Sequence, residues 1–325
     1  MHKAQKRNKF SVKSIVDVLN QEKKVVKKVF GPFWNEGETC LLFAGSGVGK
    51  TILGYDIAMS IANNTHYWPE DMSEVHVPVL YCDLEMSEDQ FCKRYEGCKK
   101  DLFVNNIFRF TADDCAFELN PENFISGVKD QIKRTGAKVL IIDNISCVLG
   151  NPTEKIARKF MNDVRALRNK YHLSVMVIGH TTKGKAGKPI TQDALGGSKM
   201  LVNFCDSACA LSRSEKGISS RYLKQVKSRS TAELDGVAEL RLTDDPYVHF
   251  EFVEYNEEED HLPQKGHKKD GRVKFDEAAR QSVIDLHRQK MSVRKISEQT
   301  GIPKSTVCDI IHKLDSGESQ VPPAA

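Results

Sequence analysis

The sequence lacks any long hydrophobic run. No stretch approaches the roughly 18 to 20 apolar residues that cross a bilayer. The basic start, residues 1–9, has no apolar segment behind it, which argues against a secretory signal. No two of the nine cysteines have the two-residue spacing of a zinc knuckle. These absences predict a cytoplasmic chain with reduced thiols and no membrane partner.

A strong charge of either sign is also lacking, because the formal net charge is only +4 over 325 residues. The basic residues are nevertheless clustered, at 3–28, 183–188 and 265–274, and an acidic run occupies 254–260. Such basic clusters are typical of contacts with nucleic acid or of a solvated surface, and composition alone leaves both open.

Short apolar runs alternate with longer segments of helical period between residues 38 and 253. This alternation predicts an α/β domain whose mainly parallel sheet carries helices on its faces. The last three runs are separated only by short turns, which indicates antiparallel strands at the sheet edge. The predicted strands are residues 40–44, 79–83, 107–110, 139–143, 174–179, 207–211, 222–227, 238–242 and 249–253.

The segments outside this domain differ from it in composition. Acidic residues, Pro263 and Gly266 mark a linker, and three short helical patterns follow it. The predicted organisation is a basic N-terminal arm (1–37), the α/β domain (38–255), a linker (256–272), a small all-α domain (273–315) and a disordered tail (316–325).

A glycine-rich segment follows the first predicted strand and precedes a helical pattern. Glycines let the backbone fold around phosphates, so that consecutive N–H groups and a helix amino terminus face them. Lys50 would reach the terminal phosphates of ATP, and Thr51 would offer its hydroxyl to Mg²⁺. Ala44 replaces the first glycine of this P-loop motif, which a small residue can do if its φ is negative. The predicted nucleotide-binding residues are Ala44, Gly45, Ser46, Gly47, Val48, Gly49, Lys50 and Thr51.

Two further predicted strands end in acids. The run 139–143 is apolar up to Asp143, as expected for a buried parallel strand that presents a carboxylate to the metal at the sheet's carboxyl edge. The run 79–83 is followed by Glu85, which can orient and deprotonate a water in line with the γ-phosphate. Asp83 competes for the same role, and a structural role for either acid stays open.

The order of these motifs resembles a known family. A strand ending in Leu84-Glu85-Met86-Ser87, between the P-loop and the Asp143 strand, resembles the RecA-like hexameric helicases of the DnaB and RepA types. The resemblance covers about residues 38–253 and implies that Glu85 is the catalytic base. It also implies that identical chains form a ring and that the ring acts in DNA replication. The strand 174–179 is followed by His180, which resembles the RepA type and would contact the γ-phosphate.

After His180 comes a polar, glycine-rich loop that contains Lys183, Lys185 and Lys188. Ammonium groups neutralise phosphates without reading bases, so this loop suits a single DNA strand. In the resembling family the corresponding loop faces the central channel and holds single-stranded DNA. A loop that is merely solvated is the alternative.

Lys227 and Arg229 are two residues apart at the end of a predicted strand, where they would project from one face. In the resembling family this Lys-x-Arg pattern is inserted into the neighbouring subunit's ATP site, where the arginine is called a finger. Such a finger accelerates phosphoryl transfer on the order of a thousandfold or more. Ordinary surface charges on an edge strand are the alternative.

The C-terminal segment has apolar residues at helical spacing in three short stretches. Gly301 separates the last two, and Pro303 suits the first turn of the third helix. This pattern predicts a helix-turn-helix and resembles the DNA-binding domain of resolvases. A protein-interaction module is the alternative. The predicted duplex-binding residues are Lys304, Ser305, Thr306, Asp309 and Lys313.

Together these features predict an Mg²⁺-dependent, DNA-binding ATPase that works as a homo-oligomer. The favoured specific form is a hexameric DNA helicase of a plasmid or mobile element. One alternative is a DNA-binding regulatory or helicase-loader ATPase without unwinding activity. Another is a RecA-like signalling ATPase whose C-terminal helices bind protein.

Overall fold

The computed structural model divides the chain into two compact units, Met1–Leu262 and Pro263–Ala325, which are described separately. The residues that the structure describes are 12–22, 25–63, 69, 72–96, 98, 106–111, 119–150, 152–180, 188–191, 199–263, 277–289, 291–300, 307–308, 310–311 and 314.

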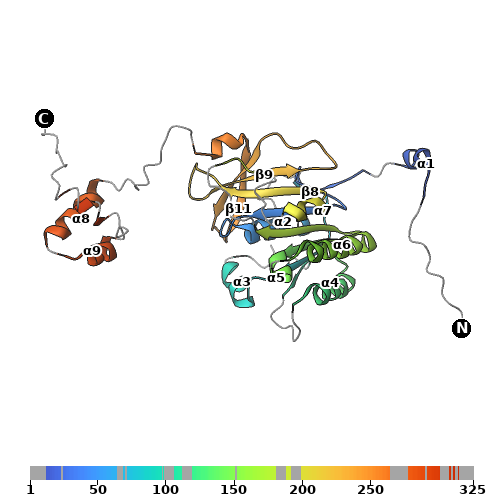
Figure 1. The fold of residues 1–325 in the computed structure, drawn as a ribbon, viewed down its shortest axis with the longest axis horizontal. Coiled ribbons are helices and arrows are strands. Elements are labelled where there is room, and N and C mark those ends of the chain that lie inside the picture. Colours follow the sequence, from blue (N-terminus) through green and yellow to red (C-terminus); the bar gives the residue numbers. More distant parts are fainter. Residues whose placement is uncertain are drawn as a thin grey trace. The chain divides into compact units, whose positions relative to one another are not determined.

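The larger unit is built on one sheet, which has nine strands within the described residues (Figure 1). Their order is β11-β10-β9-β8-β3-β7-β6-β4-β5; the strands from β8 to β5 in this order run parallel, and β9, β10 and β11 add antiparallel strands. This arrangement confirms the predicted α/β fold class. The strands are β3 Thr39–Ala44, β4 Val79–Asp83, β5 Ile107–Phe110, β6 Val139–Asp143, β7 Ser174–His180, β8 Ser207–Arg213, β9 Ser220–Lys227, β10 Val237–Thr243 and β11 His249–Asn256.

Helices cover both faces of this sheet, because successive side chains of a strand point to opposite faces and both sets are apolar. Leu42 of β3 packs with Ile57 of α2 on one face, whereas Leu41 packs with Phe124 of α4 and Phe160 of α6 on the other. No described helix has the length and apolarity to cross a membrane. The helices of this unit are α1 Ile15–Leu19, α2 Lys50–Asn63, α3 Glu88–Arg94, α4 Pro121–Thr135, α5 Ile145–Leu149, α6 Glu154–Tyr171, α7 Lys199–Phe204 and the 3-10 helix η4 Glu258–His261.

A short antiparallel hairpin, β1 Lys28–Phe30 and β2 Trp34–Asn35, precedes the main sheet. Phe30 and Trp34 are fully buried in the larger core, and the Trp34 indole donates to Glu38 O at 3.2 Å. These residues fall within the segment predicted as a basic arm, whereas the structure packs them into the core of the larger unit. Their strands are too short to give a periodic pattern.

The smaller unit contains α8 Glu277–Arg288 and α9 Val293–Thr300, followed by helical residues between 307 and 314. One apolar cluster joins the three segments through Val283, Ile296, Val307 and Ile311. These are residues that the helical spacing placed inward, so the predicted all-α unit with a three-helix core is confirmed.

Candidate nucleotide-binding site

The P-loop connects the carboxyl end of β3 to the first turn of α2, which begins at Lys50. Gly49 has φ +115°, and a Cβ there would lie 2.7 Å from Phe250 Cζ, so the tight turn requires glycine. Among the described residues, the only non-glycine with positive φ is His172, so Ala44 satisfies the condition under which it replaces glycine. The loop therefore has the backbone conformation expected of a phosphate cradle.

The Lys50 ammonium lies inside this cradle, with 6% of the residue exposed. It donates to Gly45 O at 3.2 Å and lies 3.1 Å from His180 Nδ1 at the end of β7. Burial lowers the pKa of Lys50, while the charges of Glu85 and Asp143 act in the opposite direction. The two acids thus help to keep the ammonium charged where phosphates would bind.

Asp143 ends β6 directly beside the P-loop. Its Oδ2 accepts from Tyr81 OH at 2.8 Å, and the Thr51 hydroxyl also bonds to its carboxylate. Burial raises the pKa of Asp143 to about 6. Its Oδ1 is buried and has no hydrogen-bond partner within the described residues. A hydroxyl beside a carboxylate oxygen that still needs a partner fits Mg²⁺, whose ligands are oxygens and water.

Glu85 follows β4 and is held at the same edge of the sheet. Asn144 Nδ2 donates to Glu85 Oε1, and His180 Nε2 lies 3.4 Å from that oxygen. Next along the chain, Ser87 forms a capping box with Gln90 and starts α3, which fixes the direction of the backbone after Glu85. The carboxylate is 37% exposed, so it borders the solvent side of the nucleotide site.

His180 lies between the lysine and the glutamate. Because an ammonium only donates, His180 Nδ1 accepts from Lys50, and Nε2 on the other side of the imidazole faces Glu85 Oε1. The loop with the predicted channel lysines begins directly after this residue. His180 therefore connects the nucleotide site to that loop.

Asp83, the alternative base, is fully engaged in the protein interior. Its Oδ2 accepts from Tyr55 OH at 2.9 Å and Arg109 Nε at 3.0 Å, and its Oδ1 accepts from Met86 N at 3.0 Å. The residue is 1% exposed. This geometry makes Asp83 a structural anchor for the turn that carries Glu85.

Three polar residues of this site were not predicted from the sequence. Asn144 joins Glu85 to His180, because its Nδ2 donates to Glu85 Oε1 and also lies 3.0 Å from His180 Nε2. Arg213, at the end of β8, donates to Gly47 O at 2.8 Å, and Arg221 donates to Val48 O at 3.1 Å. The only sequence signal for Asn144 is its position directly after Asp143, and the two arginines reach the P-loop through strand pairing alone.

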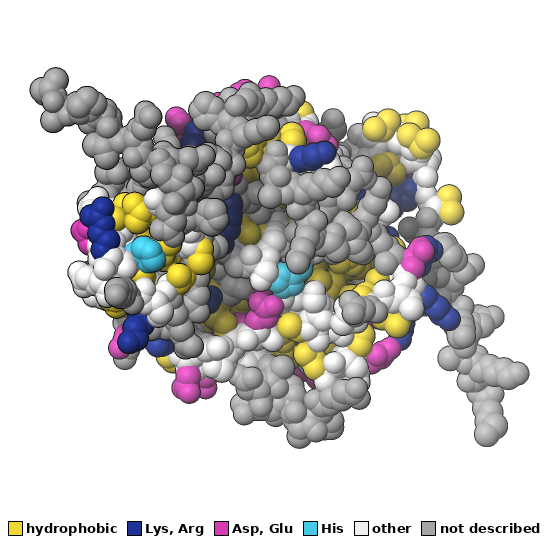
Figure 2. All heavy atoms as spheres, turned by 60° about the vertical axis from the view of Figure 1, so that its left-hand side comes forward, with side chains coloured by type: hydrophobic (Ala, Val, Ile, Leu, Met, Phe, Trp, Pro, Cys, Tyr) yellow, Lys and Arg dark blue, Asp and Glu magenta, His cyan; other side chains and the backbone are white. Residues whose placement is uncertain are grey.

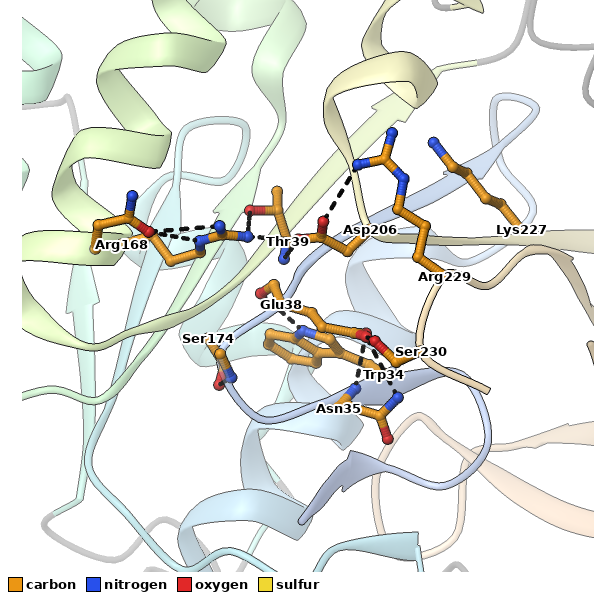
Figure 3. Close-up of polar contacts among 12 residues, drawn as sticks. Trp34, Asn35, Glu38, Thr39, Arg168, Ser174, Asp206, Lys227, Arg229 and Ser230 are labelled. Carbon is orange, nitrogen blue, oxygen red and sulfur yellow. Dashed lines mark hydrogen bonds and ion pairs between the residues drawn. The ribbon is translucent and has the colours of Figure 1, made fainter. Parts of the chain in front are cut away.

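Lys227 and Arg229 lie near Thr39, the first residue of β3 (Figure 3), whereas the P-loop follows the last residue of that strand. Lys227 Nζ donates to Val202 O at 2.6 Å, and Arg229 lies against Asp206 and Asn203 O. Asp206 in turn contacts Thr39. Neither cation is placed to contact the nucleotide of its own chain.

Most of the predicted DNA contacts lie outside the described residues. Lys188 is described and is exposed. On the face drawn in Figure 2, the described Lys and Arg side chains are interspersed with Asp and Glu. The predicted residues that are not described are Lys183, Lys185, Lys304, Ser305, Thr306, Asp309 and Lys313.

Comparison with known proteins gives a family and a fold. The solved structure of the KaiC-like protein PH0186 from the hyperthermophilic archaeon Pyrococcus horikoshii OT3 matches 71% of this chain and 99% of its own, with a TM-score of 0.51 and 19% identity. At that identity the likeness shows the fold alone, and it agrees with a RecA-like core. No curated protein matches the sequence.

Two family models match separate parts of the chain. Residues 275–322 match HTH_23, a homeodomain-like domain, which agrees with the predicted helix-turn-helix class. Residues 5–186, more than half of the 325 residues, match AAA_25, described as an AAA domain. The chain therefore belongs to the AAA_25 family of AAA-domain proteins and combines a RecA-like P-loop ATPase core with a homeodomain-like helix-turn-helix unit.

Proposed function

We propose that this protein is an ATP-driven DNA motor that works as a ring of identical chains, with a replicative helicase of RepA type as the specific form. The observation that carries the proposal is the convergence of Lys50, Glu85, Asp143 and His180 at one edge of the sheet. Each comes from the end of a different strand or from the P-loop, so the fold itself assembles the groups that ATP hydrolysis requires.

The residues have separate roles in this proposal. P-loop amides and Lys50 bind the phosphates, and Thr51 and Asp143 hold Mg²⁺. When bound, this ion neutralises charge on the phosphate oxygens. Glu85 accepts the proton of the attacking water, because it borders solvent while Asp83 is occupied by internal hydrogen bonds.

His180 links hydrolysis to DNA in this proposal. A γ-phosphate would compete for the Lys50 ammonium that His180 Nδ1 now faces at 3.1 Å. The His180 imidazole would then change its contacts with Asn144 and Glu85, and the loop that follows His180 would move with this residue. Lys183, Lys185 and Lys188 in that loop are proposed to hold one DNA strand in the channel.

The ATP site is proposed to be shared between chains. Lys227 and Arg229 lie at the end of β3 away from their own P-loop, which is where a neighbouring chain would receive them. This placement supports a ring, although the number of subunits stays a prediction from the family resemblance. The homeodomain-like unit would attach the ring to duplex DNA.

The decisive experiment is strand displacement on a forked duplex with ATP, run beside ATPase assays with and without single-stranded DNA. A motor should displace the strand, its ATPase should be stimulated by single-stranded DNA, and Lys50→Ala should abolish both. ATP hydrolysis that is indifferent to DNA, with no displacement, would overturn the motor.

A regulatory or helicase-loader ATPase is the second candidate, favoured by the match to a homeodomain-like domain, which suits attachment to one site. Such a protein would bind duplex DNA in a nucleotide-dependent manner and would not displace a strand. The same forked-duplex assay therefore separates the two functions.

A further inference from the structure

Asp206 connects Arg229, the proposed finger, to the central strand β3 of the sheet. It lies between α7 and β8, where its backbone N donates to Thr39 O at 2.8 Å and its Oδ2 accepts from Thr39 N at 3.0 Å. Arg168 of α6 forms an ion pair with the same Oδ2 and donates to Thr39 Oγ1 at 3.2 Å. Asp206 is thereby fixed to the start of β3.

The other carboxylate oxygen faces Arg229. Asp206 Oδ1 lies 3.5 Å from Arg229 Nη1, and Arg229 Nη2 donates to Asn203 O at 3.2 Å (Figure 3). The Arg229 side chain is 51% exposed, whereas that of Asp206 is 23% exposed. The guanidinium is therefore held on one side by the protein and open to another molecule on the other.

Lys227 shares this environment. Burial lowers the pKa of Lys227, the charge of Arg229 lowers it further, and the charge of Asp206 acts in the opposite direction. The two cations repel each other, and Asp206 is a carboxylate beside both. Without it, the long Arg229 side chain would lose an acceptor and gain rotamer freedom.

We propose that Asp206 is a positioning residue that holds Arg229 in the orientation required at the neighbouring chain's ATP site. This inference rests on the proposed shared site. A half-exposed ion pair contributes little to stability, so the effect should appear in the rate. Preorganising a cation for the transition state matters because a displacement of about 1 Å can cost up to roughly a hundredfold in rate.

The test uses mixed oligomers of two full-length chains. Chain X carries Glu85→Gln and keeps its finger, and chain Y carries Arg229→Ala and keeps its own hydrolytic residues. Turnover in the mixture then arises only where a Y site faces the finger of an X chain. Asp206→Asn is introduced into X in one mixture and into Y in another.

Asp206→Asn in X should lower kcat by roughly threefold to tenfold with KM little changed. In Y the arginine is already absent, so the same change has no Arg229 to reposition and turnover should stay as in the parent mixture. A folding or nucleotide-binding defect would instead lower activity when the change is in Y. Glu154→Gln in X, which breaks the exposed Arg158–Glu154 pair of α6, is the matched control and should be silent.

Each remaining outcome is informative. Equal losses with the change in X and in Y would make Asp206 a structural residue and overturn the positioning role, as would no loss in either. If X and Y form mixed oligomers that are inactive before Asp206 is altered, the shared site itself fails, and with it the proposed ring mechanism.

Discussion

Replacing Glu85 by Gln removes a charge from the nucleotide site while keeping the shape of the side chain. The Gln carbonyl can still accept from Asn144 Nδ2, and the side chain is 37% exposed, so no buried group loses its partner. The amide cannot accept the proton of water. Turnover should therefore fall by about 10² to 10⁴, equivalent to about 3 to 5 kcal/mol of transition-state stabilisation.

The assay is steady-state ATP hydrolysis combined with nucleotide-binding measurements on the same preparation. Binding should persist in Glu85→Gln, because Lys50 and the P-loop amides are unchanged. Asp83→Asn is the matched control on the neighbouring acid. It weakens the ion pair with Arg109, whose side chain is 17% exposed, and should lower the free energy of unfolding by about 2 to 4 kcal/mol.

The two variants should therefore differ in kind. Glu85→Gln should be stable and inactive, whereas Asp83→Asn should be less stable and keep turnover per folded molecule within about tenfold. If Glu85→Gln hydrolyses ATP at nearly the wild-type rate, the carboxylate is not the base. If Asp83→Asn is stable and inactive, the base has been assigned to the wrong acid.

Three further predictions concern other parts of the chain. Because burial raises the pKa of Asp143 from 3.8 to about 6, the free energy of unfolding of the unliganded protein should fall by about 2 to 3 kcal/mol as pH rises from about 4 to 6. In denaturant titrations Asp143→Asn should abolish this fall. The same pH dependence in the variant would contradict the assignment to Asp143. Gly49→Ala should weaken nucleotide binding severely by steric conflict with Phe250, while Gly217→Ala, at an ordinary φ, should bind normally. Ile296→Ala, in the small core, should cost about 2 to 4 kcal/mol there and reduce duplex binding without loss of basal ATPase; equal loss of both would refute separate roles for the two units.

The parts of the fold that could be predicted are those with a local physical signal. A parallel strand buried on both faces must be apolar throughout, which is why residues 139–143 indicate a strand and why Asp143 stands out at its end. The P-loop is similarly local, since its glycines and Lys50 are adjacent in sequence. The order of these motifs along the chain then placed Glu85 in the same site.

The parts that could not be predicted depend on contacts between segments distant in sequence. Arg213 reaches the P-loop only because β8 pairs with β3, and nothing around it distinguishes it from a surface arginine. The hairpin with Trp34 was not predicted because its strands have only three and two residues, too few to show repeated alternation of apolar and polar side chains. Asp206 likewise acquires its partners from Thr39 and Arg168, which lie 167 and 38 residues before it in the sequence.

Strand β3 connects two sites with different proposed roles, one at each of its ends. Its last residue, Ala44, opens the P-loop, and its first, Thr39, is bonded to the carboxylate that contacts Arg229. At about 3.3 Å per residue, the two ends of this six-residue strand are roughly 17 Å apart. A side chain held at one end cannot reach a phosphate at the other without breaking the partly buried contacts around Asp206. The proposed mechanism therefore requires that Lys227 and Arg229 of each chain enter the ATP site of a neighbouring chain. Catalysis and assembly then depend on the same contact between subunits.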